Sequence, residues 1–411
     1  MKKTAPNIAN RTIFVRDNLD VLSGINDSCI DLIYLDPPFN SNRKFAAPAG
    51  SKAAGASFVD AWTLDMINAA WVDVIQAERP KLAALIKGIG EVNGNSDKAY
   101  LIFMARRLLE MHRVLKDTGS IYLHCDQTMS HSLKLLMDFI FGKKNFKNHL
   151  AWCYKENETA TKFFPRKHDH ILFYTKTNDY VFNVLRGEIT EAQAKRYNHI
   201  DEKGNRWANM KGKKRMLEGG ARLRDWWDLP ITQKKERTGY PTQKPIALLE
   251  RIIAASSNKG DLVLDPFCGC ATAGVAAERL ERQWIGVDLS DKSVDLIRER
   301  LEAEEHLWRQ VGKGKHLISR KDLPERTDTG KIITNLRRHK KTLYDECGGY
   351  CQGCSEHFRI QHLEIDHKTP RSKGGTDTKG NLHLLCGSCN RIKGNRTQEY
   401  LIARLKELDR L

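Results

Sequence analysis

The sequence predicts an α/β fold, with a large doubly wound domain followed by a small metal-stapled module. Two observations carry this prediction. Between residues 12 and 290, short apolar runs typical of buried strands alternate with stretches whose apolar residues fall at helical spacing. Further along, four cysteines stand in two Cys-x-x-Cys pairs, a spacing typical of a zinc site.

The composition limits the class of protein. The chain has 411 residues, enough for two or three domains, and 68 Lys+Arg against 51 Asp+Glu give a net charge of +17. That charge favours a polyanionic partner. No apolar run is long enough to span a membrane, and no apolar signal segment follows Met1. Ten cysteines without an export signal argue against a disulfide framework. We expect a cytoplasmic protein.

The stretch from residue 30 to residue 40 organises the large domain. Residues 30–35 form a short apolar run, which predicts a buried parallel strand. Pro37 and Pro38 end this strand because they cannot donate hydrogen bonds to a neighbour. Asp36 and Phe39 therefore lie at the carboxyl end of a strand, the edge where open α/β sheets bind ligands.

The remaining elements follow in order. Residues 41–98 carry little pattern and are predicted to be connecting structure. Gly119 is expected to close the helix that precedes it. Strands are expected at 12–15, 30–35, 120–126, 169–176, 261–265 and 283–288, and helices at 19–22, 99–115, 133–142, 248–253 and 275–280.

Residues 177–240 break the alternation of helix and strand. Between residues 195 and 237 there are 13 Lys/Arg and 6 Asp/Glu, interleaved with Tyr197, Trp207, Trp226 and Trp227. Basic residues beside aromatic ones suit contact with phosphates and bases. The alternative is a solvated basic insertion with buried tryptophans, and we favour a nucleic-acid-recognition role.

A second ligand-binding pattern begins at Asp265. The strand that ends there runs into a loop containing Gly269, and the next strand ends at Asp288, 288 − 265 = 23 residues later. This order is typical of a nucleoside-binding half of a Rossmann-type sheet. The backbone of the loop encloses the ligand, and the acid after the next strand binds ribose hydroxyls.

With these motifs, residues 12 to about 300 resemble the S-adenosylmethionine-dependent DNA amino-methyltransferases in their beta-type order. The resemblance implies a seven-stranded sheet in which the strand before Asp36 lies beside the strand before Asp265. It implies that Asp17 reads the cofactor's adenine and that Thr242 and Lys244 contact its amino-acid end. Ala271 stands where many relatives have glycine. The implied site comprises catalytic Asp36, Pro37, Pro38 and Phe39, and cofactor-binding Asp17, Thr242, Lys244, Asp265, Phe267, Gly269 and Asp288.

The residue types suit methylation of a base amine. Such an amine is a poor nucleophile because its lone pair is delocalised into the ring. Asp36 accepting one N–H, and a carbonyl of the prolyl turn accepting the other, would direct the lone pair at the methyl donor. Phe39 would stack on a base flipped out of double-stranded DNA. An acid at position 36 favours adenine N6, because N4-cytosine enzymes more often carry serine there. Cytosine N4 stays open, and an RNA substrate is less favoured. The chain lacks a Pro-Cys dipeptide, so a C5-cytosine mechanism has no thiolate candidate.

The C-terminal module is predicted to be a zinc domain. We divide the chain into a methyltransferase domain at 1–305, a basic linker at 306–342 and a zinc module at 343–411. A polar linker of this kind predicts few contacts between the two modules. Such a small module needs the folding energy that a bound metal supplies. The predicted zinc ligands are Cys351, Cys354, Cys386 and Cys389.

Between and after the cysteine pairs, the Asp366-His367 pair, Asn381 and Asn390 resemble the HNH nucleases, which implies a zinc-stapled ββα-metal fold. The resemblance implies that His367 activates water as a general base. Asp366 and Asn390 would hold Mg²⁺, and Asn381 would fix the loop that aims His367. The alternative is a zinc-stapled ribbon that only binds DNA. We expect a role in restriction-modification or in DNA protection of a phage or its host, and leave monomer or homodimer open.

Overall fold

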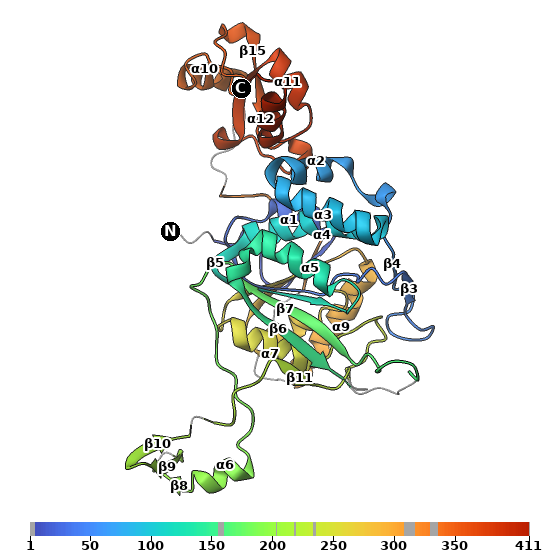
Figure 1. Cartoon of the computed structure of the whole chain (residues 1–411), viewed down its shortest axis with the longest axis vertical. Coiled ribbons are helices and arrows are strands. Elements are labelled where there is room, and N and C mark those ends of the chain that lie inside the picture. The colour runs from blue at the N-terminus through green and yellow to red at the C-terminus, as the bar shows by residue number, and fades with distance from the viewer. Residues whose placement is uncertain are drawn as a thin grey trace.

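A computed structural model describes residues 5–154, 160–202, 204–217, 219–232, 236–307, 317–328 and 336–410. Much of the linker predicted at 306–342 lies outside these ranges. A long, twisted sheet forms the centre of the large domain, the basic insert extends from one end, and the C-terminal module lies at the other (Figure 1). Among the described helices, none has the length and apolar character needed to cross a membrane.

The central sheet has nine strands. Its strands pair in parallel, except that β7 runs antiparallel to both of its neighbours. The seven longer strands confirm the expected sheet, and two strands of three residues, β11 and β14, extend its edges. In spatial order they are β11 (Trp226–Asp228), β6 (Phe146–Cys153), β7 (His168–Thr175), β5 (Leu115–Cys125), β2 (Ile30–Leu35), β12 (Leu262–Asp265), β13 (Gln283–Asp288), β1 (Thr12–Val15) and β14 (Ile318–Arg320).

The pairing of β2 with β12 positions the site. Leu32 pairs with Val263 and Ile33 with Leu264, in parallel. Both strands are buried on both faces and end at the same edge of the sheet. The turns after Asp36 and Asp265 therefore face one another, although 265 − 36 = 229 residues separate them in sequence. This neighbourhood was expected from the sequence.

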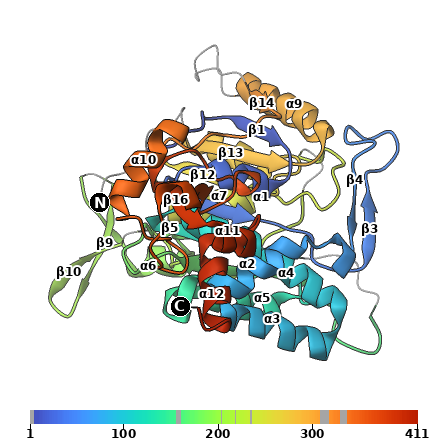
Figure 2. The same ribbon diagram turned by 90° about the horizontal axis from the view of Figure 1, so that it is seen from above.

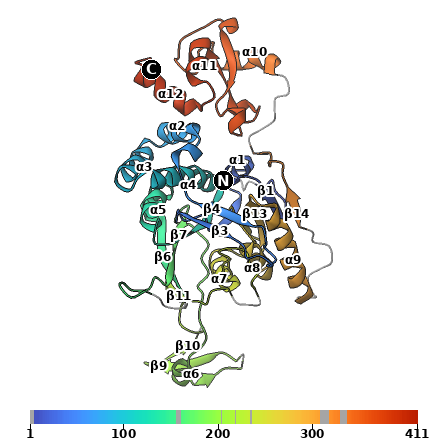
Figure 3. The same ribbon diagram turned by 90° about the vertical axis from the view of Figure 1, so that its right-hand side faces the viewer.

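Helices cover both faces of the sheet, as the alternating pattern predicts. One apolar core forms between the sheet and α1–α5, and the other between the sheet and α7–α9 (Figure 3). The helices of the first face are α1 (Asn18–Gly24), α2 (Ala69–Glu78), α3 (Pro80–Asn93), α4 (Asn95–Val114) and α5 (Ser130–Met137). Those of the second are α7 (Ile246–Ser256), α8 (Thr272–Arg279) and α9 (Asp291–Leu307).

Two predictions about local structure are wrong. Residues 41–98 are not mere connection, because they form a hairpin of β3 (Arg43–Ala46) and β4 (Ser57–Asp60), followed by α2, α3 and the start of α4. Alanine and glycine dilute the apolar pattern of α2 and α3, so helical spacing is hard to see. Gly119 does not close a helix either: α4 ends at Val114 and passes directly into β5.

The basic insert contains a small separate sheet. Strands β8 (His199–Ile200), β9 (Arg206–Met210) and β10 (Lys213–Met216) pair antiparallel, preceded by helix α6 (Glu191–Arg196). This arm projects away from the central sheet (Figure 1). The chain then returns to the main sheet through β11, which pairs in parallel with β6.

The C-terminal module has the predicted ββα arrangement. Strands β15 (Leu363–His367) and β16 (Leu382–Cys386) pair antiparallel and lead into α11 (Gly387–Lys393), with α10 (Leu336–Glu346) before them and α12 (Gln398–Glu407) after. The module does not stand apart from the large domain. Helix α12 lies against α2 (Figures 2 and 3), and Arg396 pairs with Asp73 at 3.3 Å. The prediction that few contacts join the two modules is therefore wrong.

Two glycine-to-alanine substitutions should have opposite effects on stability. At Gly274 in α8, a Cβ atom would lie 2.9–3.1 Å from the ring of Trp284, which is buried and donates a hydrogen bond to Glu278. Gly274→Ala should destabilise the fold by about 1–3 kcal/mol through overpacking. Gly88 in α3 has open space around it, so Gly88→Ala should stabilise by about 0.5–1 kcal/mol. Thermal unfolding of the full chain, followed by circular dichroism, measures both, and equal shifts would contradict this packing.

Candidate active site and metal centre

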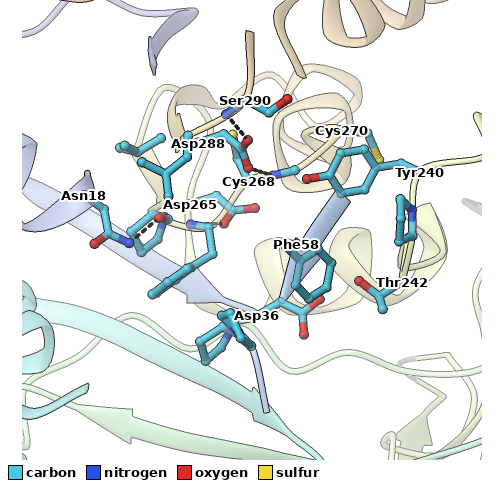
Figure 4. Close-up of a pocket in the computed structure, with 18 of the residues that line it drawn as sticks. Asn18, Asp36, Phe58, Tyr240, Thr242, Asp265, Cys268, Cys270, Asp288 and Ser290 are labelled. Carbon is cyan, nitrogen blue, oxygen red and sulfur yellow. Dashed lines mark hydrogen bonds between the residues drawn. The ribbon is translucent and has the colours of Figure 1, made fainter. Parts of the chain in front are cut away.

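A cavity of about 630 Å³ opens where β2 and β12 end. Its wall combines the turn after β2, the loop after β12, the end of β13 and the segment before α7 (Figure 4). All eleven residues predicted for the large domain line it. They are Asp17, Asp36, Pro37, Pro38, Phe39, Thr242, Lys244, Asp265, Phe267, Gly269 and Asp288.

The carboxylate of Asp36 has one paired and one unpaired oxygen. Its Oδ2 accepts a hydrogen bond from Lys244 Nζ at 2.7 Å. Its Oδ1 is buried, and among the described residues it has no hydrogen-bond partner. An unsatisfied buried acceptor costs free energy, so this oxygen is placed to accept an N–H from a molecule that enters the cavity.

Lys244 lies beside the turn that follows β2, in contact with Asp36. Its side chain is 9% exposed, and its Nζ lies 5.3 Å from the centroid of the Phe39 ring. The sequence predicts a contact with the amino-acid end of the cofactor, and the ion pair with Asp36 is an additional feature that no motif indicated. Thr242, two residues earlier, lines the same cavity with a left-handed φ of 59°.

The turn after Phe39 is held by a buried acid that sequence reasoning missed. Asp60, 1% exposed, accepts the backbone N–H groups of Asn40 and Ser41 at 2.7 and 2.9 Å. It lies at the end of β4, in the region that had seemed unpatterned. Phe45 and Phe58 of the same hairpin stack on one another and line the cavity. Pairing across a hairpin is not visible in the sequence.

The second wall of the cavity is acidic. Asp265 accepts the Phe267 N–H at 3.1 Å, and burial, together with the charges of Asp36 and Asp288, raises the pKa of Asp265 well above its ordinary value. Asp288 accepts the Gly269 N–H at 3.0 Å, and burial raises its pKa as well. Several carboxylates thus share one poorly solvated space, an arrangement that favours a cationic ligand.

The loop between these acids requires unusual backbone angles. Gly269 has a φ of 49°, and a Cβ there would lie 2.8 Å from the Tyr240 ring. Only glycine allows both the angle and this close approach. Ala271 adopts the left-handed conformation directly before α8, with its methyl group buried. The loop therefore keeps at Ala271 the backbone conformation that glycine would adopt without strain.

Arg107 in α4 connects the two walls. It binds both carboxylate oxygens of Asp17 at 2.7 and 2.9 Å, and its Nε donates to Asn18 at 2.6 Å. Asn18 in turn donates to the carbonyl of Pro266 at 2.7 Å. Burial lowers the pKa of Arg107 to about 10, so it remains charged at neutral pH. Nothing in the sequence distinguished this arginine from others in its helix.

The four predicted cysteines come together in the small module. All are buried, and their sulfur atoms lie within 4.8 Å of one another. Backbone N–H groups of Gly353 and Cys386 donate to Cys351 Sγ at 3.4 and 3.2 Å. Four converging thiols with donors directed at their sulfurs fit a tetrahedral zinc site, because such donors stabilise thiolates.

His367 has a partner that the sequence did not reveal. Its Nε2 lies 2.6 Å from Oδ1 of Asp377. Asn381 accepts the Thr369 N–H at 2.9 Å and donates to the Thr369 carbonyl at 3.0 Å. It therefore holds the loop after His367, in keeping with the role predicted for it.

The residues expected to hold Mg²⁺ are engaged elsewhere. Asp366 Oδ2 lies 3.1 Å from His383 Nε2 and 2.8 Å from Nζ of the buried Lys393. Burial alone would raise the pKa of Asp366, but these two partners lower it to about 2. Asn390 donates to Glu364 at 2.5 Å. Because Lys393 already balances the charge of Asp366, the donor set is a poor fit for a divalent cation as it stands.

Two parts of the chain match two different families of known proteins. Residues 30–299 match the N6/N4 methyltransferase family, described as DNA methylase, and residues 351–396 match the HNH endonuclease family. Among curated proteins, the chain is 31% identical to the type II methyltransferase M.EcaI of Enterobacter cloacae, over 47% of this chain and 56% of that protein. The chain thus spans about half the length of that relative.

Other relatives match over more of their length. The type II methyltransferase M.HpaI of Haemophilus parainfluenzae is 31% identical, over 57% of this chain and 69% of its own. The DNA adenine methyltransferase YhdJ of Escherichia coli is 27% identical, over 72% and 84%. A solved structure of an M1.HpyAVI–SAM complex is 18% identical with a TM-score of 0.42, over 71% of this chain and 98% of that one. By the family match over residues 30–299, the chain belongs to the N6/N4 family of DNA methylases, and it carries an HNH endonuclease domain after the methylase domain.

Proposed function

We propose that this protein transfers a methyl group from S-adenosylmethionine to the N6 amine of adenine in double-stranded DNA. The observation that carries the proposal is the buried Oδ1 of Asp36 in the cavity wall, which has no hydrogen-bond partner in the described part of the chain. An exocyclic amine that donates an N–H to this oxygen would satisfy it. The lone pair of the amine would then be directed into the cavity, where the cofactor is expected.

The residues around Asp36 support this role. Lys244 holds Oδ2 at 2.7 Å, which orients the carboxylate. Phe39 offers a ring on which an extruded base can stack. The prolines and Asp60 make the turn rigid, so the carboxylate and the ring keep a fixed relation.

The acidic wall supports S-adenosylmethionine as the ligand. This molecule supplies a methyl group on a cationic sulfonium and carries an ammonium group. A cationic ligand offsets the cost of burying Asp265 and Asp288 close together. We assign Asp288 to the ribose hydroxyls, Asp17 to the adenine and Thr242 to the amino-acid end.

Adenine is favoured over cytosine by the acid at position 36 and by the similarity to the adenine methyltransferase YhdJ. N4 methylation of cytosine is the alternative. Expression in a host that lacks adenine methylation, followed by genome-wide mapping of modified bases, decides between them. Modified cytosine with unmodified adenine would refute the N6 assignment.

We assign target recognition to residues 177–240. In the projecting arm, His199 stacks on Trp207 at 4.3 Å between ring centroids, and Lys214 Nζ lies 4.7 Å from the Trp207 ring. Neighbouring aromatic and basic groups of this kind suit contact with bases and phosphates. We place the methylase domain at 1–305, the linker at 306–342 and the zinc module at 343–411, within a restriction-modification or DNA-protection system.

Nuclease activity of the C-terminal module is a second candidate function, favoured by the pair of His367 and Asp377. An aspartate that accepts the Nε2 proton leaves Nδ1 free to take a proton from water. The ion pair between Lys393 and Asp366 favours the alternative, a domain that only binds DNA. We therefore propose no role for Mg²⁺ in a specific step.

Asp36→Ala should reduce methyl transfer to DNA by at least about 100-fold, the usual cost of losing a positioned group in the transition state. Binding of S-adenosylmethionine, measured by calorimetry, should persist. The matched control is Asp126→Ala, since Asp126 ends the neighbouring strand but bonds to Thr128 and does not line the cavity. Transfer above a few per cent of the parent rate by Asp36→Ala would refute the role of Asp36.

Asp265→Asn should weaken S-adenosylmethionine binding by about 1–3 kcal/mol. The same variant should be at least as stable as the parent, because it removes a buried charge. Asp261→Asn, at the opposite end of β12, should leave the affinity unchanged. Unaltered affinity in Asp265→Asn would show that the cofactor lies elsewhere.

The zinc site and His367 should respond differently. Chelating zinc should unfold the small module, because the binding energy of the metal is its folding energy. His367→Ala and Asp377→Asn should leave the module folded, leave methylation intact and abolish any cleavage of unmethylated supercoiled plasmid. Circular dichroism and gel electrophoresis with Mg²⁺ or Mn²⁺ report both effects. A parent protein that never cuts would favour the DNA-binding alternative.

A further inference from the structure

A buried chain of polar side chains lies behind the catalytic turn. The Tyr34 hydroxyl lies 3.0 Å from His124 Nδ1, and His124 Nε2 lies 3.1 Å from Asp169 Oδ2. The other carboxylate oxygen of Asp169 accepts a hydrogen bond from Tyr154 at 3.2 Å. His124 is 0% exposed and does not line the cavity. It therefore cannot touch substrate or cofactor.

The chain fixes how the imidazole is oriented. Asp169 can only accept when it is ionised, so His124 Nε2 carries a proton and donates it. Burial raises the pKa of Tyr34 well above its ordinary value, so its hydroxyl stays protonated and donates to Nδ1. Both ring nitrogens of His124 therefore have hydrogen-bond partners. The imidazole can form both hydrogen bonds in only one orientation of its ring plane.

The imidazole ring of His124, held in this orientation, packs against the Phe39 ring. The Phe39 and His124 rings are stacked, with centroids 5.9 Å apart and planes 21° apart. Trp152 meets His124 edge-on at 5.6 Å. Burying an imidazole and a carboxylate adds little stability over an apolar wall, but a satisfied polar network specifies one geometry.

We propose that His124 is a positioning residue that sets the plane of the Phe39 ring and thereby the position in which the extruded base is stacked. The inference rests on the proposed function, because it needs Phe39 to stack on the target base.

The same chain connects the catalytic turn to the recognition segment. Trp152, against His124, donates its indole N–H to the Leu229 carbonyl at 2.9 Å and pairs in register with Trp227 of β11. Asp169 belongs to β7, and Tyr154 directly follows β6, the strand that pairs with β11. β11, through which the insert returns to the main sheet, is therefore linked to the Phe39 ring through Trp152 and His124.

The test compares two buried tyrosines, of which Tyr34 lines the cavity and Tyr122 does not. Tyr34 and Tyr122 pair in register on neighbouring strands, and each is 2% exposed. The Tyr34 hydroxyl bonds to His124, whereas that of Tyr122 bonds to Ser256 at 2.7 Å. Tyr34→Phe should lower kcat for methyl transfer about 2- to 10-fold through loss of one buried hydrogen bond. Tyr122→Phe should leave kcat unchanged.

His124→Ala and Asp169→Asn extend the test. His124→Ala should lower kcat about 10- to 100-fold by misplacing the base, with the affinity for S-adenosylmethionine within twofold of the parent. The DNA is a duplex carrying the mapped target site, with 2-aminopurine replacing the target base. Its fluorescence in the complex should rise in His124→Ala and Asp169→Asn, because an extruded base that stacks less well is quenched less.

Each outcome decides between the two proposals. Parent-like kcat and fluorescence in His124→Ala, or equal effects of Tyr34→Phe and Tyr122→Phe, would overturn the positioning role while the proposed function stands. Equal losses of kcat and cofactor affinity would mean that His124 merely supports the fold, and would also overturn it. A parent protein that transfers no methyl group to any DNA base would refute the proposed function itself, and the inference with it.

Discussion

The parallel pairing of β2 with β12 is the interaction on which the rest of the site depends. It brings together the turns after Asp36 and Asp265, which are 265 − 36 = 229 residues apart in the sequence. Strands buried on both faces leave few alternatives in register, because a slip would move large apolar side chains out of the core. The core therefore fixes the position of the turn after Asp36 relative to the acidic loop after Asp265. The helices on both faces protect that pairing from water.

Charge inside the cavity is managed in two ways. Arg107 and Lys244 each hold a carboxylate, and each is itself almost fully buried, so the pairs are strong and inflexible. Among the described residues, no Lys or Arg forms an ion pair with Asp265 or Asp288, and burial raises the pKa values of both acids. On one side of the cavity, the carboxylates are therefore held by cations of the protein itself. On the other side, a cationic ligand would balance the charge of Asp265 and Asp288. Perturbed acids of this kind cluster at functional sites.

The C-terminal module follows the same logic with less core. Its apolar cluster is small and includes all four clustered cysteines, so a metal bound by them would supply stability that the core alone does not. His367 gains an orienting carboxylate from Asp377, but Asp366 is neutralised by Lys393. Contact between α12 and α2 joins the module to the helical layer that also carries Arg107. The two domains are therefore less independent than a basic linker suggests.

Local sequence signals were enough to predict where the site lies and which groups it contains. Prolines that stop a strand, a glycine loop and paired cysteines are local signals, because their backbone or ligand requirements act within a few residues. The turn after Asp36 and the loop around Gly269 could be predicted for that reason. By contrast, Asp17, Thr242 and Lys244 were predicted only from the resemblance to the methyltransferase family. Asp60, Arg107, Asp377 and the His124 chain could not be predicted, because their roles come from partners 10 to 90 residues away in the sequence. The ion pairs of Lys244 with Asp36 and of Lys393 with Asp366 are visible only in the folded chain. The sequence shows that each lysine is charged, but it does not show which acid the fold places beside it.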